Sequence, residues 1–236
     1  MQNNNQKDYD GLSELLSIEK FMPKYNSYIM ELCPNLIKSK NKVVDFGAGI
    51  GTLSIIYKNM YKKEPICIEI DKKNINLLEK KGLKVFERIA DIPGHIDLVF
   101  SSNVLEHIDD DIGILEEIRK KLSKKGVLYL YLPAHEILRS RLDETVGHYR
   151  RYSKKDILSK LKHTGFVVTK AHYADSLGFF ITLIIKIINY NPISDIGSST
   201  SMKVYDKYIL PISKLIDYLG GRYLIGKNIV VCAKKA

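Results

Sequence analysis

VVDFGAGIGTLS, residues 43–54, joins a short apolar run to a helical pattern through glycines at positions 47, 49 and 51. Glycine allows positive φ angles and lets a ligand approach the backbone closely, and the N-terminus of the following helix presents unpaired amides. The segment therefore predicts a ligand-binding loop between a strand at 42–46 and a helix at 53–61. A tight strand-to-helix turn without a ligand is the alternative interpretation.

The spacing of this loop differs from that of dinucleotide-binding loops. Those loops have the pattern G-x-G-x-x-G, whose third glycine would fall where this chain has Thr52. Asp45 precedes Gly47 by two residues, and a carboxylate there is unfavourable beside a pyrophosphate. It suits a ligand that carries a cationic amino group and a sulfonium, so Asp45 argues against a dinucleotide.

A second acidic signal ends the next apolar run, ICIEID at 66–71. Glu69 lies about where a carboxylate would accept hydrogen bonds from both hydroxyls of a ribose. Asp71 competes for that role, but it precedes KKN and has the character of a helix cap. The pattern favours Glu69 as the ribose ligand.

Short apolar runs alternate with helical patterns along the rest of the chain. Such runs are typical of parallel strands that are buried on both faces. The predicted strands are 42–46, 66–71, 83–86, 96–102, 126–133, 166–173 and 228–234, and the predicted helices include 53–61, 75–81, 110–122 and 153–165. This order predicts an α/β, Rossmann-like, doubly wound sheet of seven strands, mostly parallel with an antiparallel last strand.

The chain is expected to form one domain, 1–236, with two helical additions. An N-terminal cap at 12–40 contains a helical pattern that is interrupted near Pro23. The polar residues 1–11 have no apolar core of a secretory signal, and we expect them to be disordered or loosely docked. A helical insertion at 174–222 precedes the last strand.

The insertion contains LGFFITLIIKII at 177–188, which is apolar on every helical face except at Lys186. It is shorter than the ~20 residues that a membrane-spanning helix needs. The first interpretation is a buried helix. The alternatives are a lid over an apolar substrate, with a mobile loop at 192–201, or a surface that docks on a membrane or a partner.

Three motifs resemble those of the class I methyltransferases that depend on S-adenosylmethionine (SAM). They are VVDFGAGIG at 43–51, ICIEID at 66–71 and IDLVFSSNVLEHIDD at 96–110, and the resemblance covers roughly residues 40–170. The flanking segments at 24–36 and 132–157 look like a bacterial subgroup of small-molecule methyltransferases. The resemblance implies SAM as the cofactor, S-adenosylhomocysteine (SAH) as the product and a methyl donor site in these motifs.

The resemblance assigns the donor site residue by residue. It implies contacts from Asp45, Gly47, Ala48, Gly49, Gly51, Glu69, Ile70, Ser102, Asn103 and Val104. It also implies an acidic residue that meets the adenine amino group, for which Asp91 is the first candidate and Glu87 the competitor. Tyr25 is a further candidate that could close over the donor, although an aromatic residue on a helix face is more often part of the core.

The acceptor is expected beyond the carboxyl ends of the strands, near the loops that follow Ser102 and Leu132. In-line transfer from a sulfonium depends mostly on positioning, and a base is needed only where the acceptor must lose a proton. The catalytic candidates are His107, His148 and Tyr149, and the substrate-binding candidates are His135, Arg150, Arg151 and Tyr152. The alternatives are that His107 packs beside Glu106, and that 147–155 is a solvated basic loop.

Charge and cysteine content narrow the functions. A net charge of +10, from 37 Lys and Arg against 27 Asp and Glu, favours anionic partners. The three cysteines suggest reduced thiols in a cytoplasm, and the acidic run at 108–111 more plausibly begins a helix than binds a metal. The first hypothesis is methylation of a small molecule that is anionic or linked to a sugar or lipid. The alternatives are an RNA or protein methyltransferase, with nucleic acid disfavoured, and a non-catalytic SAM-binding protein.

Overall fold

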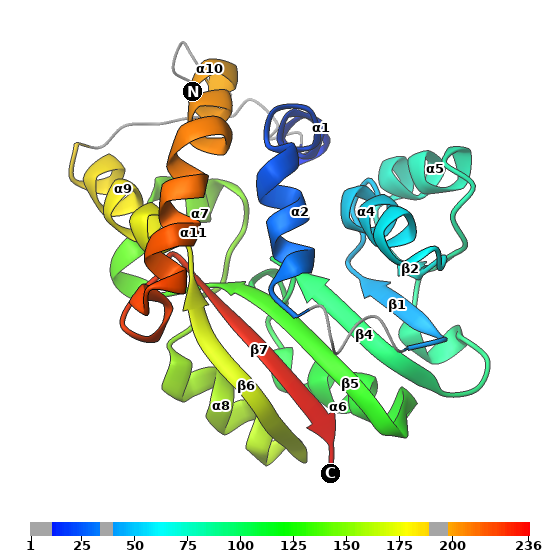
Figure 1. The fold of residues 1–236 in the computed structure, drawn as a ribbon. Helices are drawn as coiled ribbons and strands as arrows, with labels where there is room; N and C mark the ends of the chain where they lie inside the picture. Colours follow the sequence, from blue (N-terminus) through cyan, green and yellow to red (C-terminus); the bar gives the residue numbers. More distant parts are fainter. Residues whose placement is uncertain (1–10, 34–39, 189–197) are drawn as a thin grey trace, which may run out of the picture.

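The computed structural model describes residues 11–33, 40–188 and 198–236 (Figure 1), so the expectation for residues 1–10 lies outside the described residues. Within these ranges the strands form one sheet. They are β1 (Val43–Phe46), β2 (Ile66–Ile68), β3 (Val85–Phe86), β4 (Ile96–Ser102), β5 (Leu122–Pro133), β6 (Phe166–Ala174) and β7 (Asn228–Lys235). The seven strands lie in the order β3-β2-β1-β4-β5-β7-β6. β7 is antiparallel to both of its neighbours, and the other pairs are parallel, as predicted.

The two largest differences from the predicted strand boundaries are in β2 and β5. β2 ends at Ile68, so Glu69 and Asp71 both lie in the loop beyond it. β5 begins at Leu122 rather than at 126, because Leu122 is fully buried and pairs with Ile96 at the start of β4.

The helices begin where the sequence offers caps. Pro23 begins the second helix. The side chains of Asp71, Asp110 and Ser153 each accept hydrogen bonds from backbone amides in the first turn of the helix that follows them. The helices are α1 (Gly11–Phe21), α2 (Pro23–Glu31), α4 (Thr52–Tyr61), α5 (Lys72–Lys80), α6 (Asp111–Lys121), α7 (Arg141–Thr145), α8 (Lys154–His163), α9 (Ser176–Ile187), α10 (Ser198–Val204) and α11 (Leu210–Tyr218). The short helical turns are η1 (Ile89–Asp91), η2 (Leu105–His107), η3 (Glu136–Leu138), η4 (Tyr205–Ile209, a π-helical turn) and η5 (Gly221–Tyr223).

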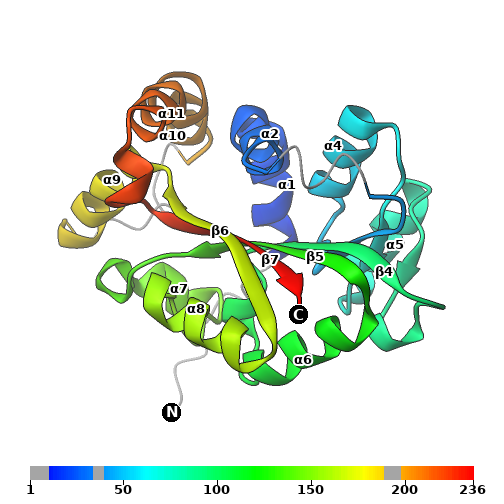
Figure 2. The ribbon, with the colours of Figure 1, turned by 60° about the horizontal axis from the view of Figure 1, so that its bottom comes forward.

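Two apolar layers hold the helices to the sheet. Figure 2 shows α6, α7 and α8 on one side of the sheet and α2, α4 and α11 on the other. Side chains alternate along β5, so Leu128, Leu130 and Leu132 join the first layer while Tyr129 and Tyr131 join the second. On the second side, α2 lies between α4 and the insertion helices, above the edge of the sheet where β1 and β4 end (Figure 1).

The insertion between β6 and β7 is helical, but α9 is not buried along its length. Phe179 packs inward, whereas Phe180, Ile184 and Ile187 are 51%, 57% and 73% exposed. The interpretation of 177–188 as a buried core helix is therefore wrong for its outer face; among the described elements α9 packs mainly against α11 and η3. Among the described residues no helix has the length and apolar content to cross a membrane. The predicted loop at 192–201 lies outside the described residues up to 197, and α10 begins at Ser198.

Candidate functional site

A cavity of about 890 Å³ lies at the carboxyl ends of the central strands, with residues of α1 and α2 in its wall. That volume suits a nucleoside-sized ligand together with a small second molecule. Of the residues that the sequence singled out, the cavity wall contains Tyr25, Asp45, Gly47, Ala48, Gly49, Glu69, Ile70, Ser102, Asn103, Val104, His107, His148 and Arg151. Gly51, Asp91, His135, Tyr149, Arg150 and Tyr152 do not line it.

The glycine loop needs its glycines for two different reasons. Gly47 has a φ angle of +74°, and a Cβ atom there would lie 2.3 Å from a methyl group of Val104. Gly51 also has a positive φ angle, but it precedes α4 and is packed against Leu78 and Leu83 rather than against the cavity. Gly47 therefore lets the β4 end approach the loop, and Gly51 supports the loop from behind.

Asp45 is buried at the base of the cavity. Its carboxylate accepts a hydrogen bond of 2.7 Å from the hydroxyl of Ser54, and burial raises its pKa to about 7. A buried carboxylate without a cationic partner is costly, so a cationic group of a ligand would stabilise its charged form. This environment fits the predicted contact with a donor that carries an amino group and a sulfonium.

Glu69 and Asp71 have separate roles. The Glu69 carboxylate lies in the cavity wall, where it accepts hydrogen bonds from the backbone amides of Gly49, Ile70 and Asp71. The Asp71 carboxylate instead accepts bonds from the first amides of α5. The preference for Asp71 as a helix cap is therefore confirmed, and Glu69 lines the cavity, where its contact with a ribose stays a prediction.

The end of β4 completes the wall opposite the glycine loop. Ser102, Asn103 and Val104 all line the cavity, and Asn103 turns the chain with a φ angle of 52°. Asp91 is exposed in η1 and does not line the cavity, whereas Glu87 and Arg88 do. The structure therefore places the competitor Glu87, rather than Asp91, next to the space expected for an adenine.

Tyr25 is fixed by a buried polar contact set. Its hydroxyl lies 2.9 Å from that of Tyr131, and the side-chain amide of Asn228 donates to both hydroxyls. The ring also packs edge-on against Tyr205. Tyr25 thus joins α2, β5 and β7 at the cavity wall, and it is part of the core as well as of the site.

His148 and Arg151 converge on Asp143 at the far side of the cavity. His148 Nδ1 and Arg151 Nε both lie 2.8 Å from the same Asp143 oxygen, and the Ser140 amide donates to the other oxygen. These contacts hold the pKa of Asp143 well below its usual range despite its burial. Because the ionised carboxylate can only accept, His148 Nδ1 donates this hydrogen bond, and the other ring nitrogen, Nε2, points toward Glu106.

Two further titratable groups face this cluster. Glu106 is fully buried, and burial raises its pKa to about 8. One of its oxygens lies 3.9 Å from His148 Nε2. The ring of His107 meets that of His148 edge-on at 4.5 Å, and desolvation in the cavity wall, with His148 as neighbour, lowers the His107 pKa to about 4.

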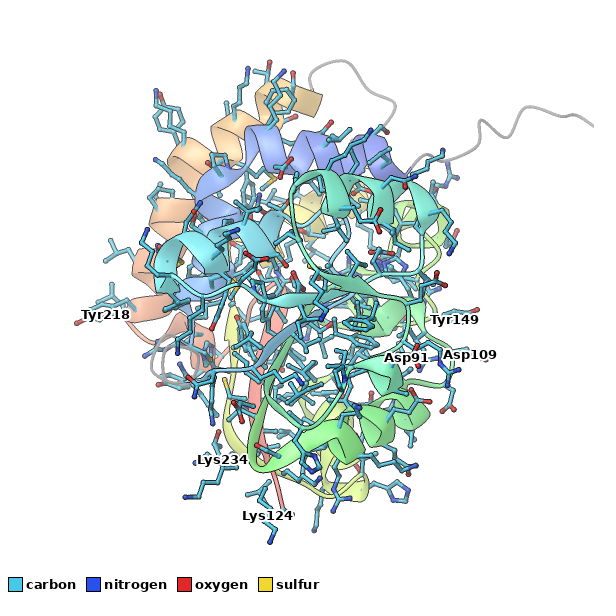
Figure 3. The ribbon with its side chains drawn as sticks, turned by 90° about the vertical axis from the view of Figure 1, so that its right-hand side faces the viewer. Asp91, Asp109, Lys124, Tyr149, Tyr218 and Lys234 are labelled. Carbon is cyan, nitrogen blue, oxygen red and sulfur yellow. The ribbon has the colours of Figure 1, made fainter. Side chains whose placement is uncertain are left out.

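The remaining sequence candidates point away from the cavity. Tyr149 is 56% exposed, and Figure 3 shows it with Asp109 at the edge of the molecule. Arg150 pairs with Asp109 and Asp111, so the structure does not bring the two guanidiniums together on one anion.

Tyr152 and His135 belong to the packing of the fold. The Tyr152 side chain is fully buried, and its hydroxyl donates to Asp111. His135 stacks on Tyr173 and meets Phe179 edge-on. The substrate-binding roles expected for Arg150, Tyr152 and His135 therefore find no support, since one is paired outside the cavity and the others pack within the protein.

Several wall residues carried no signal in the sequence. Glu14 of α1 and Lys227 line the cavity, yet neither lies in a recognisable motif, and Asp143 lies in the segment 132–157 without having been a site candidate. Lys227 precedes β7, far along the chain from the glycine loop, and only the folding of the sheet brings it to the site. No motif spacing in the sequence could have identified Lys227 as a residue of the cavity wall.

Comparisons with known proteins agree with this geometry. A family model described as a methyltransferase domain matches residues 18–171, more than half of the chain. A search of curated protein sequences found no significant match.

Solved methyltransferase structures share the fold at low sequence identity. A SAM-dependent methyltransferase from Archaeoglobus fulgidus is 20% identical, with a TM-score of 0.63 over 94% of this chain and 99% of that one. Phosphoethanolamine N-methyltransferase 2 of Haemonchus contortus, in complex with SAM, is 14% identical, with a TM-score of 0.64 over 98% of this chain and 58% of that one. Magnesium protoporphyrin IX methyltransferase of Synechocystis PCC 6803, with bound SAH, is 13% identical, with a TM-score of 0.54 over 94% and 84%. The chain therefore belongs to the methyltransferase-domain family and is a SAM-dependent methyltransferase.

Proposed function

We propose that this methyltransferase acts on a small-molecule acceptor that carries negative charge. The observation that carries the proposal is Lys227, whose side chain lines the cavity beyond the glycine loop. Among the described residues no carboxylate lies within ion-pair distance of its ammonium group, and burial lowers its pKa. An anionic group of the acceptor would supply the missing counter-charge.

The surroundings of Lys227 favour an anion at that point. Its Nζ lies 6.0 Å and 5.7 Å from the ring centroids of Tyr25 and Tyr205. Aromatic faces attract a cation without neutralising it, and the Asp175 charge opposes the lowering of the Lys227 pKa by burial, so both favour the charged form that an anionic ligand would meet. Glu14 also lies in this wall, and burial raises its pKa, which reduces its tendency to compete as a fixed negative charge.

In the proposed reaction the chain acts mainly by positioning. Bound SAM would supply an electrophilic methyl group on its sulfonium. Asp45 and Glu69 would hold the amino and ribose ends of the donor, and Gly47 lets Val104 pack closely against the loop that would bind it. Holding donor and acceptor in line can contribute up to ~7–11 kcal/mol to the lowering of the barrier.

A proton acceptor is available where the acceptor atom is a hydroxyl or an ammonium. The lowered pKa keeps His107 neutral at physiological pH, and His148 is held with Nε2 free by its contact with Asp143. Either imidazole could take a proton from the acceptor as the methyl group is transferred.

The test is an acceptor screen with isotope-labelled SAM, followed by kinetics of Lys227→Met. We expect turnover of anionic metabolites, and a rise of about tenfold or more in KM for the acceptor when this charge–charge contact is removed. The donor Kd should not change. Lys234→Met is the matched control, because Lys227 directly precedes β7 whereas Lys234 is exposed near the other end of that strand (Figure 3). Turnover of neutral acceptors alone, or unchanged kinetics in Lys227→Met, would refute the proposal. Turnover of RNA or protein instead would favour the alternative acceptor class.

The apolar surface of the insertion supports a lipid-linked acceptor within this proposal. Phe180 and Ile184 of α9 and Leu215 and Tyr218 of α11 are more than half exposed, and the two helices contact each other. Exposed apolar side chains beside lysines such as Lys186 are typical of helices that lie on an anionic membrane surface. Co-sedimentation with anionic vesicles should be lost in Ile184→Ser/Leu215→Ser, while vesicles of neutral lipid should bind less; equal sedimentation of the variant would exclude this role.

A further inference from the structure

Glu106, His107 and His148 form a compact group of potential metal ligands beside the cavity. One ligand atom from each lies within 4.8 Å of the other two. Glu106 and His107 belong to η2, directly after β4, whereas His148 lies in the loop after α7. Two imidazoles and a carboxylate from two separate segments therefore meet at one point.

Burial of the Glu106 carboxylate has a free-energy cost that its hydrogen bonds do not offset. The side chain is fully buried, and within the part of the chain that the structure describes neither of its oxygens has a hydrogen-bond partner. A buried carboxylate in native structures is normally paired, hydrogen-bonded or bound to a metal. The nearby guanidinium of Arg151 is already engaged by Asp143, so among the described residues only the His148 ring, 3.9 Å away, lies within ion-pair distance of Glu106.

The contacts behind His148 orient its ring toward Glu106. Its Nδ1 bonds to Asp143 at 2.8 Å, and Asp143 is itself held by Arg151 and by the Ser140 amide. Ligand histidines in metal sites commonly donate their second ring nitrogen to a carboxylate in this way. The remaining nitrogen, Nε2, faces the Glu106 oxygen at 3.9 Å.

We propose that Glu106, His107 and His148 bind a divalent transition-metal ion of the Zn²⁺ class. Two imidazole nitrogens and one carboxylate oxygen are a donor set that such ions favour, and three protein ligands leave positions open for a further ligand. Metal–ligand bonds of about 2.0–2.2 Å would put neighbouring ligand atoms roughly 3–3.5 Å apart, so small side-chain rotations would close the site. The ion would neutralise the Glu106 carboxylate.

The position of the ion would give it a function in the cavity. His107 and His148 line the cavity wall, so the open coordination positions would face the acceptor space. A metal ion in contact with an acceptor oxygen would hold it in place and lower the pKa of a hydroxyl. In the metal-bound protein the ion would therefore replace His107 and His148 in promoting loss of the acceptor proton, because their free nitrogens would be its ligands. The sequence suggested no metal because the acidic run at 108–111 lacks a second ligand cluster; His148 supplies that ligand from far along the chain.

The experiment is a titration of tag-free, chelator-treated protein with Co²⁺, followed by its visible absorption bands and by displacement with Zn²⁺. We expect one ion per chain, and at least tenfold weaker binding in each of Glu106→Gln, His107→Ala and His148→Ala. Asp143→Asn should weaken binding about 10–100-fold, because it removes the support of a ligand. His163→Ala is the control, since this exposed histidine at the end of α8 lies outside the ligand group.

Each result of the Co²⁺ titration either supports or overturns the proposed metal site. Absence of Co²⁺ binding in the wild type, or binding by the three ligand variants as tight as in the wild type, would overturn the proposal. If Glu106→Gln does not fold, His107→Ala decides the matter, because the His107 side chain is exposed and outside the core clusters. The titration needs no acceptor, so its result is independent of whether the proposed anionic substrate is correct.

Discussion

The donor side and the acceptor side of the cavity are built in different ways. The donor side comes from segments that directly follow the adjacent strands β1, β2 and β4, and backbone amides hold its key carboxylate, Glu69. The acceptor side combines Glu14, His148 and Lys227, which lie far apart in the chain, and side chains hold side chains there. We therefore expect substitutions in the donor side to be poorly tolerated, because they alter the backbone at the strand ends. Single substitutions in the acceptor side should instead be able to change the substrate, because they alter individual side chains.

The largest expected effect tests the backbone fit of the donor side. Gly47→Ala introduces a methyl group at a positive φ angle and within 2.3 Å of Val104. Left-handed strain alone costs roughly 1–3 kcal/mol, so we expect SAM affinity to fall by about 100-fold or more once the clash is added. Calorimetric titration with SAM and SAH measures it.

Gly82→Ala is the control for that substitution. Gly82 has a similar φ angle of +73°, but no atom lies within 4 Å of the added Cβ. It should lower the stability by about 1 kcal/mol and leave SAM affinity unchanged. Equal losses of affinity in both variants would mean that general destabilisation, rather than the approach of Val104, explains the result.

Glu69→Gln tests the carboxylate of the donor side. Loss of charged hydrogen bonds to a ribose is worth about 1.5–3 kcal/mol, which corresponds to a roughly 10–100-fold weaker SAM affinity. Asp71→Asn is the matched control, and it should leave SAM affinity and the cap of α5 nearly unchanged, because Asn caps a helix about as well as Asp. Unchanged titrations of Glu69→Gln would remove Glu69 from the donor site.

The pH dependence of donor binding tests Asp45. Burial raises its pKa to about 7, so in the free protein it becomes protonated below neutral pH and loses its attraction for a cationic donor. SAM affinity should therefore fall as the pH decreases below about 7, by up to about tenfold per pH unit. Asp45→Asn should bind SAM weakly and with a flat profile over this range. A wild-type profile without an inflection near pH 7 would contradict the assignment.

The same raised pKa predicts the opposite trend for the free protein. Its stability should decrease as the pH rises from about 4 through about 7, because the folded state binds the Asp45 proton more tightly than the unfolded state does. Asp45→Asn should reduce this slope in thermal melts. A slope equal to that of the wild type would show that another group dominates it.

The smallest effect concerns the acceptor side. Tyr149→Ala should change the kinetics by less than about twofold, because this exposed side chain lies outside the cavity. His148→Ala, one residue earlier, should lower the activity strongly by removing the contact with Asp143 and the free nitrogen. A large effect of Tyr149→Ala would show that the loop rearranges when the acceptor binds.

The sequence by itself determined the sheet and most of the donor side. The apolar runs predicted the strands, and the glycine spacing, Asp45 and Glu69 are local signals, because parallel strands bring their carboxyl ends to one edge. The exposed face of α9 was not predictable, because periodicity shows which residues are apolar and not which neighbours cover them. Only the tertiary structure placed Lys227 in the cavity, turned His148 inward and Tyr149 outward, and left Glu106 buried beside two histidines, since these depend on side-chain directions and contacts between distant segments.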